Sequence, residues 1–496
     1  MVEGGSRLCA TVAARTMSDL RLRRDAQAGA DLVELRLDGV SGVDVAGALA
    51  DRRRPVVATC RPAWEGGGFA GSEAERRRIL LEACRLGAEY VDVEHRSEFA
   101  DDVLAARDGR GVVLSFHDFE GVPADLEERY RAMRGTGAEV VKIAAAVGSL
   151  SESLRIMTLG SGDEHRVLIG MGTAGIPSRV LAGRFGSCWT YAGEGVAPGQ
   201  IELDRMQRLY RFPALSDSTA VYGVLGAPIG HSLSPAMHNA GFREAGIDAV
   251  YLPLEAADVD DFLRFARAVG LCGASVTAPF KERVAACVVD QDATSRAVGA
   301  TNTLRRRSDG EWEGNNTDVP GLLAPLAGRM NLNGTRATVL GAGGAARAAA
   351  FALRGEGAAV TVCARRPERA AAVAEVAPGV LTAPTPPRPG SWDLLVNTTP
   401  LGTWPEVERS PLPDGPFDGR LVYDLVYNPR ETRLLGDAAR GGCVTIGGLD
   451  MLVAQAVLQF AWWTGETPSA DLFRRAAEDD LARQAARSPL AAPRPA

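Results

Sequence analysis

The sequence predicts an α/β protein with an N-terminal (β/α)8 barrel, followed by a second half that contains an open α/β domain and a Rossmann domain. Two observations carry this prediction. Short β-rich runs alternate with helical or loop segments eight times between residues 8 and 193, and a strand, a glycine-rich turn and a helix follow one another at 337–353. The 496 residues, 46% of them hydrophobic, give room for roughly three domains of about 150 residues.

Composition excludes several classes of protein. A formal net charge of −7 argues against a nucleic-acid-binding protein, and no stretch reaches the roughly 18 apolar residues of a membrane span. Residues 1–10 lack the apolar segment of a signal peptide. Eight cysteines without a C-x-x-C pair and five histidines without ligand spacing argue against disulfides and zinc. We therefore expect a soluble, cytoplasmic protein without a metal, whose oligomeric state no pattern indicates.

Eight apolar runs are the expected strands of the barrel. They alternate with amphipathic segments such as 73–86, as βα units do. An open, doubly wound sheet is the alternative, but the count of eight favours a closed barrel of about 200 residues. The expected strands are Leu8–Ala13, Leu32–Leu37, Pro55–Cys60, Tyr90–Glu94, Gly111–His117, Val140–Ala144, Val167–Met171 and Cys188–Tyr191.

Polar side chains interrupt these strands near their C-terminal ends, where a (β/α)8 barrel builds its active site. A single buried polar residue is equally well explained as a satisfied core group. Polar residues on five strands at one rim instead indicate a site. They are Glu34 and Arg36, which share one face of a strand, and Arg61, Glu94, His117 and Lys142.

Lysine is unusually rare in this chain. Of the 55 basic residues only Lys142 and Lys281 are lysine. Arginine stays protonated and cannot form an imine, whereas a desolvated lysine can lose its proton. The alternative explanation is that both lysines remain by chance in a chain whose composition favours arginine. Lys142 lies in Val-Val-Lys-Ile-Ala, an apolar setting that favours the neutral amine, so we expect it to attack a carbonyl substrate. His117 would then move protons, Glu94 would orient the imidazole, and arginines would bind a substrate carboxylate.

Motifs in the first half resemble the type I 3-dehydroquinate dehydratases over about residues 7–212. They occur in the family's order: Val-Glu-Leu-Arg-Leu-Asp (33–38), Val-Asp-Val-Glu (91–94), Ser-Phe-His-Asp-Phe (115–119), Val-Val-Lys-Ile-Ala (140–144), Met-Gly-Thr-Ala-Gly-Ile-Pro-Ser-Arg (171–179), Phe-Gly-Ser (185–187) and Ala-Pro-Gly-Gln (197–200).

This resemblance implies a role for each rim residue. Lys142 would be the Schiff-base lysine, His117 the general acid/base and Glu94 its orienting partner. Many family members carry serine before Ala-Pro-Gly-Gln where this chain has Val196, so one hydrogen bond of the substrate or loop is expected to be missing. Arg179 would bind the substrate carboxylate, and the hydroxyls or neighbouring groups would contact Glu34, Arg36, Arg61 and Gln200.

The second half begins after a short, turn-prone stretch between Tyr210 and Ala220. An expected strand at Ala220–Leu225 leads into a loop at 226–235. Ser234 is a candidate cap of the following helix because Pro235 suits a first helical position, and it is equally a candidate ligand-binding hydroxyl.

A nucleotide site is predicted farther along. The strand Ala337–Leu340 leads into Gly-Ala-Gly-Gly-Ala-Ala-Arg (341–347) and an alanine-rich helix, the order of a Rossmann phosphate site. The next strand, Ala359–Cys363, ends in Ala-Arg-Arg (364–366), where an acidic residue would favour NAD and arginine accommodates the 2′-phosphate of NADP. A solvated basic turn is the alternative. The sequence therefore favours NADP(H), held by Gly341, Gly343, Gly344, Ala345, Arg365 and Arg366.

Lys281 and Asp318 are the candidates for proton transfer in the second half. A lysine and a carboxylate in one cleft could handle the proton that accompanies hydride transfer to a ketone. A structural salt bridge between the two residues is the alternative.

Motifs around these residues resemble the shikimate dehydrogenases over about residues 219–470. They are Gly-Ala-Pro-Ile-Gly-His-Ser-Leu-Ser-Pro (226–235), Gly-Ala-Ser-Val-Thr-Ala-Pro-Phe (273–280), Gly-Ala-Thr-Asn-Thr-Leu (299–304), Gly-Asn-Asn-Thr-Asp (314–318), Val-Asn-Thr-Thr-Pro-Leu-Gly (396–402), Asp-Leu-Val-Tyr-Asn-Pro (424–429) and Gly-Leu-Asp-Met-Leu-Val-Ala-Gln-Ala (448–456).

This second resemblance implies that Lys281 is catalytic and acts with Asp318. The family's usual Asn-Arg-Thr after the second nucleotide strand is Ala-Arg-Arg here, which removes an asparagine contact to the ribose and keeps the arginine for the phosphate. Thr398 and Gly448 would join the cofactor site. Shikimate would be held by Ser232, Ser234, Thr277, Asn302, Asp318, Tyr427 and Gln455.

Together the patterns predict a bifunctional enzyme that dehydrates 3-dehydroquinate to 3-dehydroshikimate and then reduces this product to shikimate with NADPH. Two alternatives stay open: a regulatory protein that binds these metabolites without turning them over, and a second half that prefers quinate and NAD. The expected domains are the dehydratase barrel at 1–214, the substrate-binding domain at 219–320, the Rossmann domain at 321–450, a helical return at 451–475 and a tail at 476–496.

Overall fold

The computed structural model describes residues 6–163, 165–193, 195, 197–383 and 386–487. The chain divides into two compact units. The first comprises the residues up to Val221 with Pro228–Gly230 and Asp248–Gly270, and the second comprises Tyr222–Ala227, His231–Ile247 and the residues from Leu271 on. The domain borders expected from the sequence stay predictions. Asp248–Gly270 groups with the first unit, although it follows the border expected between the barrel and the second half.

The first unit is built on eight strands in the order β7-β6-β5-β4-β3-β2-β1-β8. β1 pairs in parallel with both β2 and β8, and Arg166 of β7 forms a parallel bridge with Ser187, two residues before β8. The barrel is therefore nearly closed, which confirms the predicted fold over the open sheet. The strands are β1 Arg7–Ala13, β2 Leu32–Arg36, β3 Val56–Thr59, β4 Tyr90–Glu94, β5 Val112–Asp118, β6 Val140–Ala146, β7 Arg166–Met171 and β8 Trp189–Ala192.

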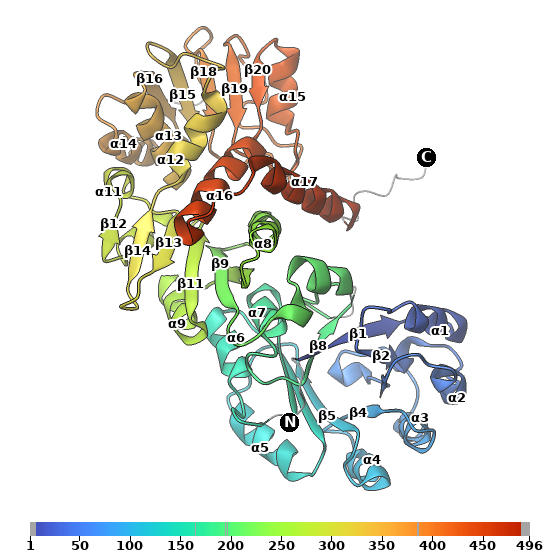
Figure 1. Cartoon of the computed structure of the whole chain (residues 1–496). Helices are drawn as coiled ribbons and strands as arrows, with labels where there is room; N and C mark the ends of the chain where they lie inside the picture. The colour runs from blue at the N-terminus through green and yellow to red at the C-terminus, as the bar shows by residue number, and fades with distance from the viewer. Residues whose placement is uncertain (1–5, 164, 194, 196, 384–385, 488–496) are drawn as a thin grey trace. The chain divides into compact units, whose positions relative to one another are not determined.

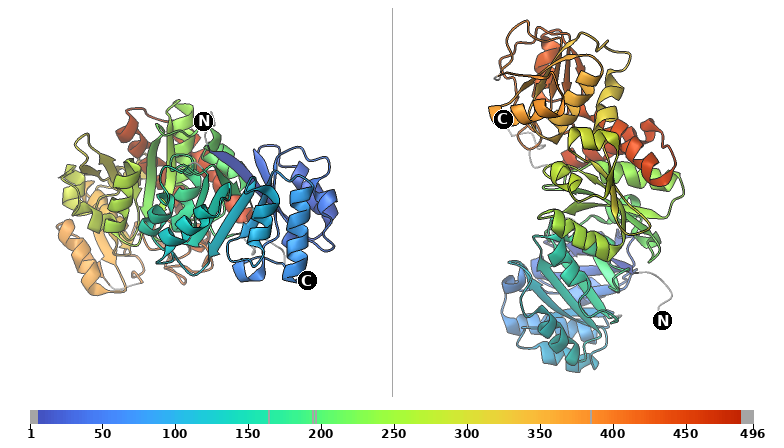
Figure 2. Two further views of the ribbon diagram at one scale, coloured as in Figure 1. Left: turned by 90° about the horizontal axis from the view of Figure 1, so that it is seen from below. Right: turned by 90° about the vertical axis from the view of Figure 1, so that its left-hand side faces the viewer.

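Helices lie on the outer side of these strands (Figures 1 and 2). Side-chain caps begin several of them: Thr16 accepts from Asp19 N, and Ser72 accepts from Glu75 N. The helices are α1 Met17–Asp25, α2 Val45–Leu49, α3 Glu73–Arg85, α4 Ala100–Arg107, α5 Leu126–Gly135, α6 Leu150–Met157 and α7 Ile176–Val180, with short 3-10 turns η2 Ala63–Glu65 and η3 Thr173–Gly175.

The inner face of each barrel strand changes character along its length. Because alternate residues share a face, β2 places Leu32, Glu34 and Arg36 on one side, and β6 likewise aligns Val140 with Lys142. Apolar residues thus begin the inner face and polar residues end it. This order puts a packed layer under a polar rim at the C-terminal end of the barrel.

Two six-stranded sheets follow. The order of the first is β10-β9-β11-β13-β14-β12, with β13 antiparallel to β11 and β14, and that of the second is β17-β16-β15-β18-β19-β20, all parallel, as in a Rossmann domain. The strands are β9 Ala220–Gly226, β10 Ala249–Glu255, β11 Leu271–Val276, β12 Asp290–Gln291, β13 Thr303–Arg306, β14 Trp312–Asn315, β15 Arg336–Leu340, β16 Ala359–Cys363, β17 Leu381–Ala383, β18 Leu394–Asn397, β19 Leu421–Asp424 and β20 Val444–Ile446.

The helices of this half differ from expectation at two places. α8 begins at Ser234 with Leu233 as its cap residue and has no side-chain cap, so the expected capping by Ser234 is wrong; Ser232 Oγ instead accepts the Ser234 N–H at 3.3 Å. α17 also runs across the border expected at 475/476 between the helical return and the tail, and both Phe473, which packs on Phe460, and Ala477 are fully buried. The helices are α8 Ser234–Glu244, α9 Val259–Val269, α10 Lys281–Ala285, α11 Ala293–Val298, α12 Asp318–Leu323, α13 Gly344–Gly355, α14 Pro367–Val376, α15 Arg433–Arg440, α16 Gly448–Thr464 and α17 Ala470–Arg487.

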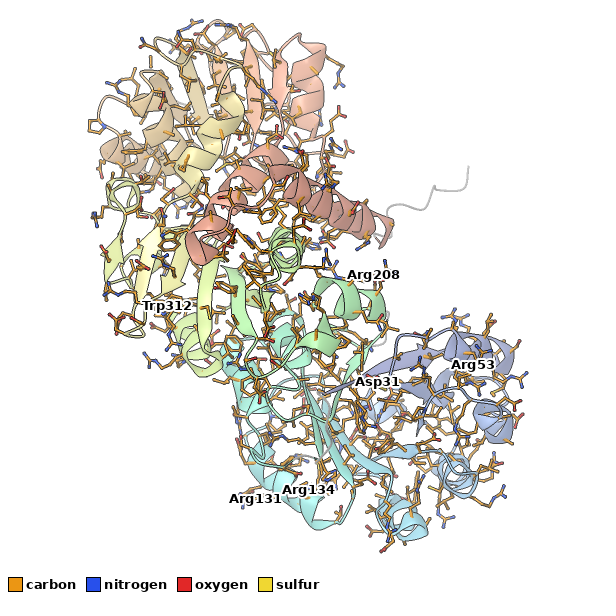
Figure 3. All side chains as sticks on the ribbon, in the orientation of Figure 1. Asp31, Arg53, Arg131, Arg134, Arg208 and Trp312 are labelled. Carbon is orange, nitrogen blue, oxygen red and sulfur yellow. The ribbon has the colours of Figure 1, made fainter. Side chains whose placement is uncertain are left out.

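Arginine takes the place of lysine on the surface. Arg53 and Arg131, both labelled in Figure 3, are exposed. Among the described residues, no helix combines the length and the apolar character that crossing a membrane requires. In the same residues, no three His, Cys, Asp or Glu side chains gather into a possible metal site.

Candidate active sites

A cavity of about 530 Å³ opens at the C-terminal ends of the barrel strands. It brings together most of the residues predicted for the first half, and it adds Thr11, Glu65 and Tyr191. Glu94 is the one predicted barrel residue that does not line it. The predicted residues that do are Glu34, Arg36, Arg61, His117, Lys142, Arg179 and Gln200.

Lys142 lies between two buried carboxylates. The residue is 4% exposed, and its Nζ lies 3.0 Å from Asp92 Oδ2 and 3.4 Å from Glu34 Oε1. The Nζ also lies 4.1 Å from the ring centre of Tyr191. Burial acts to raise the pKa of Asp92, but the charges of Arg61 and Lys142 outweigh it and hold this pKa well below its usual range. Asp92 is therefore a permanent negative charge beside the amine.

Glu65, and not Glu94, contacts the histidine. Glu65 Oε2 lies 3.0 Å from His117 Nδ1. Burial raises the pKa of Glu65 to about 7, whereas burial and the charges of Arg61 and Lys142 lower the pKa of His117 well below its usual value. Both shifts favour a neutral imidazole, and they place the titration of Glu65 near neutral pH.

The predicted pairing of Glu94 with His117 is wrong because two arginines already occupy the carboxylate. Glu94 Oε1 accepts from Arg61 Nη1 at 2.6 Å, and Oε2 accepts from Arg76 Nη1. Arg61 reaches Asp92 with its other terminal nitrogen at 2.9 Å. Glu94 therefore lies behind Arg61, outside the cavity.

Arg179 is a buried cation without a carboxylate partner among the described residues. It is 2% exposed, and its Nη2 donates to Pro198 O at 3.3 Å. Burial lowers its pKa to about 10. A desolvated guanidinium that faces a cavity fits an anionic ligand. Gln200 Nε2 donates to Thr11 Oγ1 at 3.2 Å on the same rim, and Val196 lies outside the described residues.

A second cluster forms around Lys281. Its Nζ donates to Asp318 Oδ2 at 2.6 Å, and Asn302 Nδ2 donates to Asp318 Oδ1 at 2.8 Å. Asn302 Nδ2 also lies 3.2 Å from Gln455 Oε1, which accepts from Gln459 Nε2 at 2.8 Å. Gln455 Nε2 donates to Leu452 O at 3.3 Å, which leaves the second N–H of this amide as a donor for a ligand. Gln459, one helical turn after Gln455, is a residue that the motifs did not reveal.

The other residues predicted to hold the second substrate lie in segments that follow three different strands. Ser232 and Ser234 follow β9, Thr277 follows β11, and Tyr427 follows β19. Their described contacts do not reach Lys281: Ser232 Oγ accepts from Ser234 N, and Thr277 N donates to Leu225 O at 2.8 Å.

The glycine-rich turn has the shape of a phosphate site. Gly341 has φ of +118°, and a Cβ there would collide with Thr398 Oγ1. A Cβ at Gly344 would lie 3.3 Å from Lys281 Cδ, so the turn adjoins Lys281. α13 has no side-chain cap, which leaves the N–H groups near Gly343 and Ala345 for an anion.

The remaining cofactor candidates are Gly448 and two arginines. Gly448 begins α16, and a Cβ there would collide with Leu425 O, so the chain needs glycine for close packing at this position. Arg365 and Arg366 are exposed at the end of β16, where they are open to a ribose phosphate. The residues present therefore fit NADP(H).

Family models match both halves of the chain. The type I 3-dehydroquinase model matches residues 8–217. The model of the shikimate dehydrogenase substrate binding domain matches residues 224–304, and that of the shikimate 5′-dehydrogenase C-terminal domain matches 448–478.

Similar proteins cover the chain as a whole and its second half. The chloroplastic bifunctional 3-dehydroquinate dehydratase/shikimate dehydrogenase of Arabidopsis thaliana is 34% identical over 508 residues, 95% of this chain and 84% of that protein. The NADP(+) shikimate dehydrogenase of Moorella thermoacetica is 44% identical over 274 residues, 52% of this chain and 92% of its own length. A crystal structure of a shikimate dehydrogenase in complex with NADP+ has 31% identity and a TM-score of 0.50, over 54% of this chain and 97% of that one. Because the similarity spans nearly the whole sequence, the chain belongs to the family of bifunctional 3-dehydroquinate dehydratase/shikimate dehydrogenases.

Proposed function

We propose that the barrel dehydrates 3-dehydroquinate through an imine on Lys142, and that Lys281 and Asp318 serve the NADPH-dependent reduction of 3-dehydroshikimate to shikimate. The observation that carries the first part is the buried amine between Asp92 and Glu34, in a cavity that also holds the His117–Glu65 pair. Family membership supports both activities.

In the barrel, Lys142 Nζ bonds to the carbonyl carbon of the substrate, and the carbonyl oxygen leaves as water. The iminium nitrogen occupies the position of Lys142 Nζ, where Asp92 and Glu34 stabilise its positive charge. The iminium acidifies the adjacent C–H. His117 takes that proton and then gives it to the hydroxyl group one carbon further, which leaves as water. Hydrolysis of the imine then frees the product and Lys142. Arg179 binds the substrate carboxylate throughout.

In the second half, NADPH supplies the hydride when bound. Lys281 donates a proton to the carbonyl oxygen of the substrate, and Asp318 orients the amine from 2.6 Å. Asn302 fixes Asp318, and Gln455 donates to a substrate hydroxyl. The turn at 341–345 holds the pyrophosphate, with Thr398 and Gly448 beside it, and Arg365 and Arg366 bind the 2′-phosphate.

A coupled assay tests this function. The whole chain, given 3-dehydroquinate and NADPH, should consume NADPH and form shikimate, and NADH should be a poorer reductant. Binding of 3-dehydroquinate without consumption of NADPH would instead support the regulatory alternative.

The expected cytoplasmic location stays a prediction, which cell fractionation tests.

A further inference from the structure

A segment of the dehydrogenase half packs on the barrel. Asp248–Gly270 belongs to the first unit, although the family model of the substrate binding domain spans it. Within this unit α9 packs against α6, and β10 packs against η3 and α7. α6 follows β6, and η3 and α7 follow β7, so the segment covers chain that leaves the active rim of the barrel.

Asp261 makes the hydrogen bonds that join α9 to α6. The residue is 2% exposed. Oδ2 accepts the Leu150 N–H at 3.0 Å, and Oδ1 accepts the Ser151 N–H at 2.8 Å. Both N–H groups belong to the first turn of α6, where backbone donors have no partner within the helix and the helix dipole favours a negative charge. Arg264 adds a bond from its Nε to Ser151 Oγ at 3.2 Å.

The start of α6 is connected to the wall of the dehydratase cavity. Val147, just before α6, donates its N–H to Met171 O at the end of β7, and Met171 lines the cavity. From there the chain enters η3 and α7, where Ser178 Oγ accepts from Gly170 N at 2.8 Å. The next residue is Arg179. The anchoring of α6 and the covering of α7 by β10 therefore both act on the position of Arg179.

We propose that Asp261 is a positioning residue for the dehydratase reaction, which holds the segments after β6 and β7 so that Arg179 meets the substrate carboxylate. Part of the affinity of the barrel for its substrate then depends on residues of the dehydrogenase half. This inference rests on the proposed role of Arg179. Lys142 lies within β6 itself, so its chemistry does not depend on this anchor.

The test is the dehydratase kinetics of Asp261→Ala in the full chain. Loss of the anchor should raise the KM for 3-dehydroquinate by about three- to thirtyfold, with little change in kcat. Asp261→Asn keeps one acceptor oxygen and should recover part of the affinity. Asp260→Asn is the matched control, because Asp260 is an exposed carboxylate in the first turn of the same helix. This control should leave the KM unchanged.

An unchanged KM in folded Asp261→Ala would overturn the proposal, and so would a fall in kcat alone, which indicates a smaller folded fraction. Should Asp261→Ala fail to fold, the KM of Asp261→Asn decides in the same way. Arg179→Lys is measured alongside. If Arg179→Lys keeps the wild-type KM, the proposed role of Arg179 fails, whatever Asp261 does.

Discussion

At the scale of single residues, the contact between Glu65 and His117 predicts the pH dependence of dehydration. Below about pH 7 the carboxyl of Glu65 is protonated and donates to His117 Nδ1, which leaves Nε2 protonated. Above this pH the carboxylate accepts from Nδ1–H, and Nε2 becomes a base. The dehydratase kcat/KM should therefore rise with pH up to about 7.

Glu65→Gln tests this assignment. The variant should lose the inflection near pH 7 and about 10²-fold in rate, because the amide cannot ionise or stabilise the imidazolium. Glu94→Gln should keep the inflection, since Glu94 contacts Arg61 and Arg76 rather than the histidine. The assignment is wrong if the pH profile changes in Glu94→Gln and not in Glu65→Gln.

The choice of nucleotide is also decided by single side chains. An arginine–phosphate bond contributes about 1.5–3 kcal/mol, so NADPH should be preferred over NADH by about tenfold or more. Arg365→Ala should raise the KM for NADPH and leave that for NADH nearly unchanged. Arg409→Ala, which removes a surface arginine paired with Glu406, serves as control. Equal losses with both nucleotides would mean that Arg365 supports the fold instead.

At the scale of secondary-structure elements, Arg76 ties α3 to β4. It is fully buried and contacts Glu94, and its Nη2 donates to Ser97 Oγ at 2.9 Å. Arg76→Met leaves a buried carboxylate with one partner fewer and should destabilise the barrel by about 3–5 kcal/mol. Arg77→Met removes an exposed pair with Asp102 and should cost about 0–1 kcal/mol. Urea unfolding, followed by dehydratase activity, measures both variants, and equal costs would refute the buried network.

Elements with a clear period were predictable, and side chains on loops were not. The eight expected barrel strands coincide with β1–β8 to within a few residues, because alternation and β-rich composition mark each strand. Glu65 lies in η2, outside any periodic run, so its approach to His117 follows from the tertiary fold alone. Glu94 was found as a polar residue on β4, but only the structure shows that Arg61 and Arg76 bind its carboxylate and that it does not line the cavity.

At the scale of the whole molecule, motif order predicted two catalytic halves, and this part of the prediction agrees with the family. The grouping of Asp248–Gly270 with the barrel was not predictable, because it depends on contacts such as Asp261 with Leu150 that carry no sequence signature. Lys142 and Lys281 are distributed one to each unit, so the chemistry of the two halves can be told apart by the lysine that reacts.

Borohydride trapping tests the central claim, that the barrel works through an imine on Lys142. Reduction of the imine in the presence of 3-dehydroquinate leaves a secondary amine, and besides the N-terminal amine only two residues, Lys142 and Lys281, can carry it. Mass spectrometry should find the adduct on the Lys142 peptide and none on Lys281. Lys142→Arg should give no adduct and no dehydration while 3-dehydroshikimate reduction continues. Active enzyme whose Lys142 stays unmodified under these conditions would contradict the account.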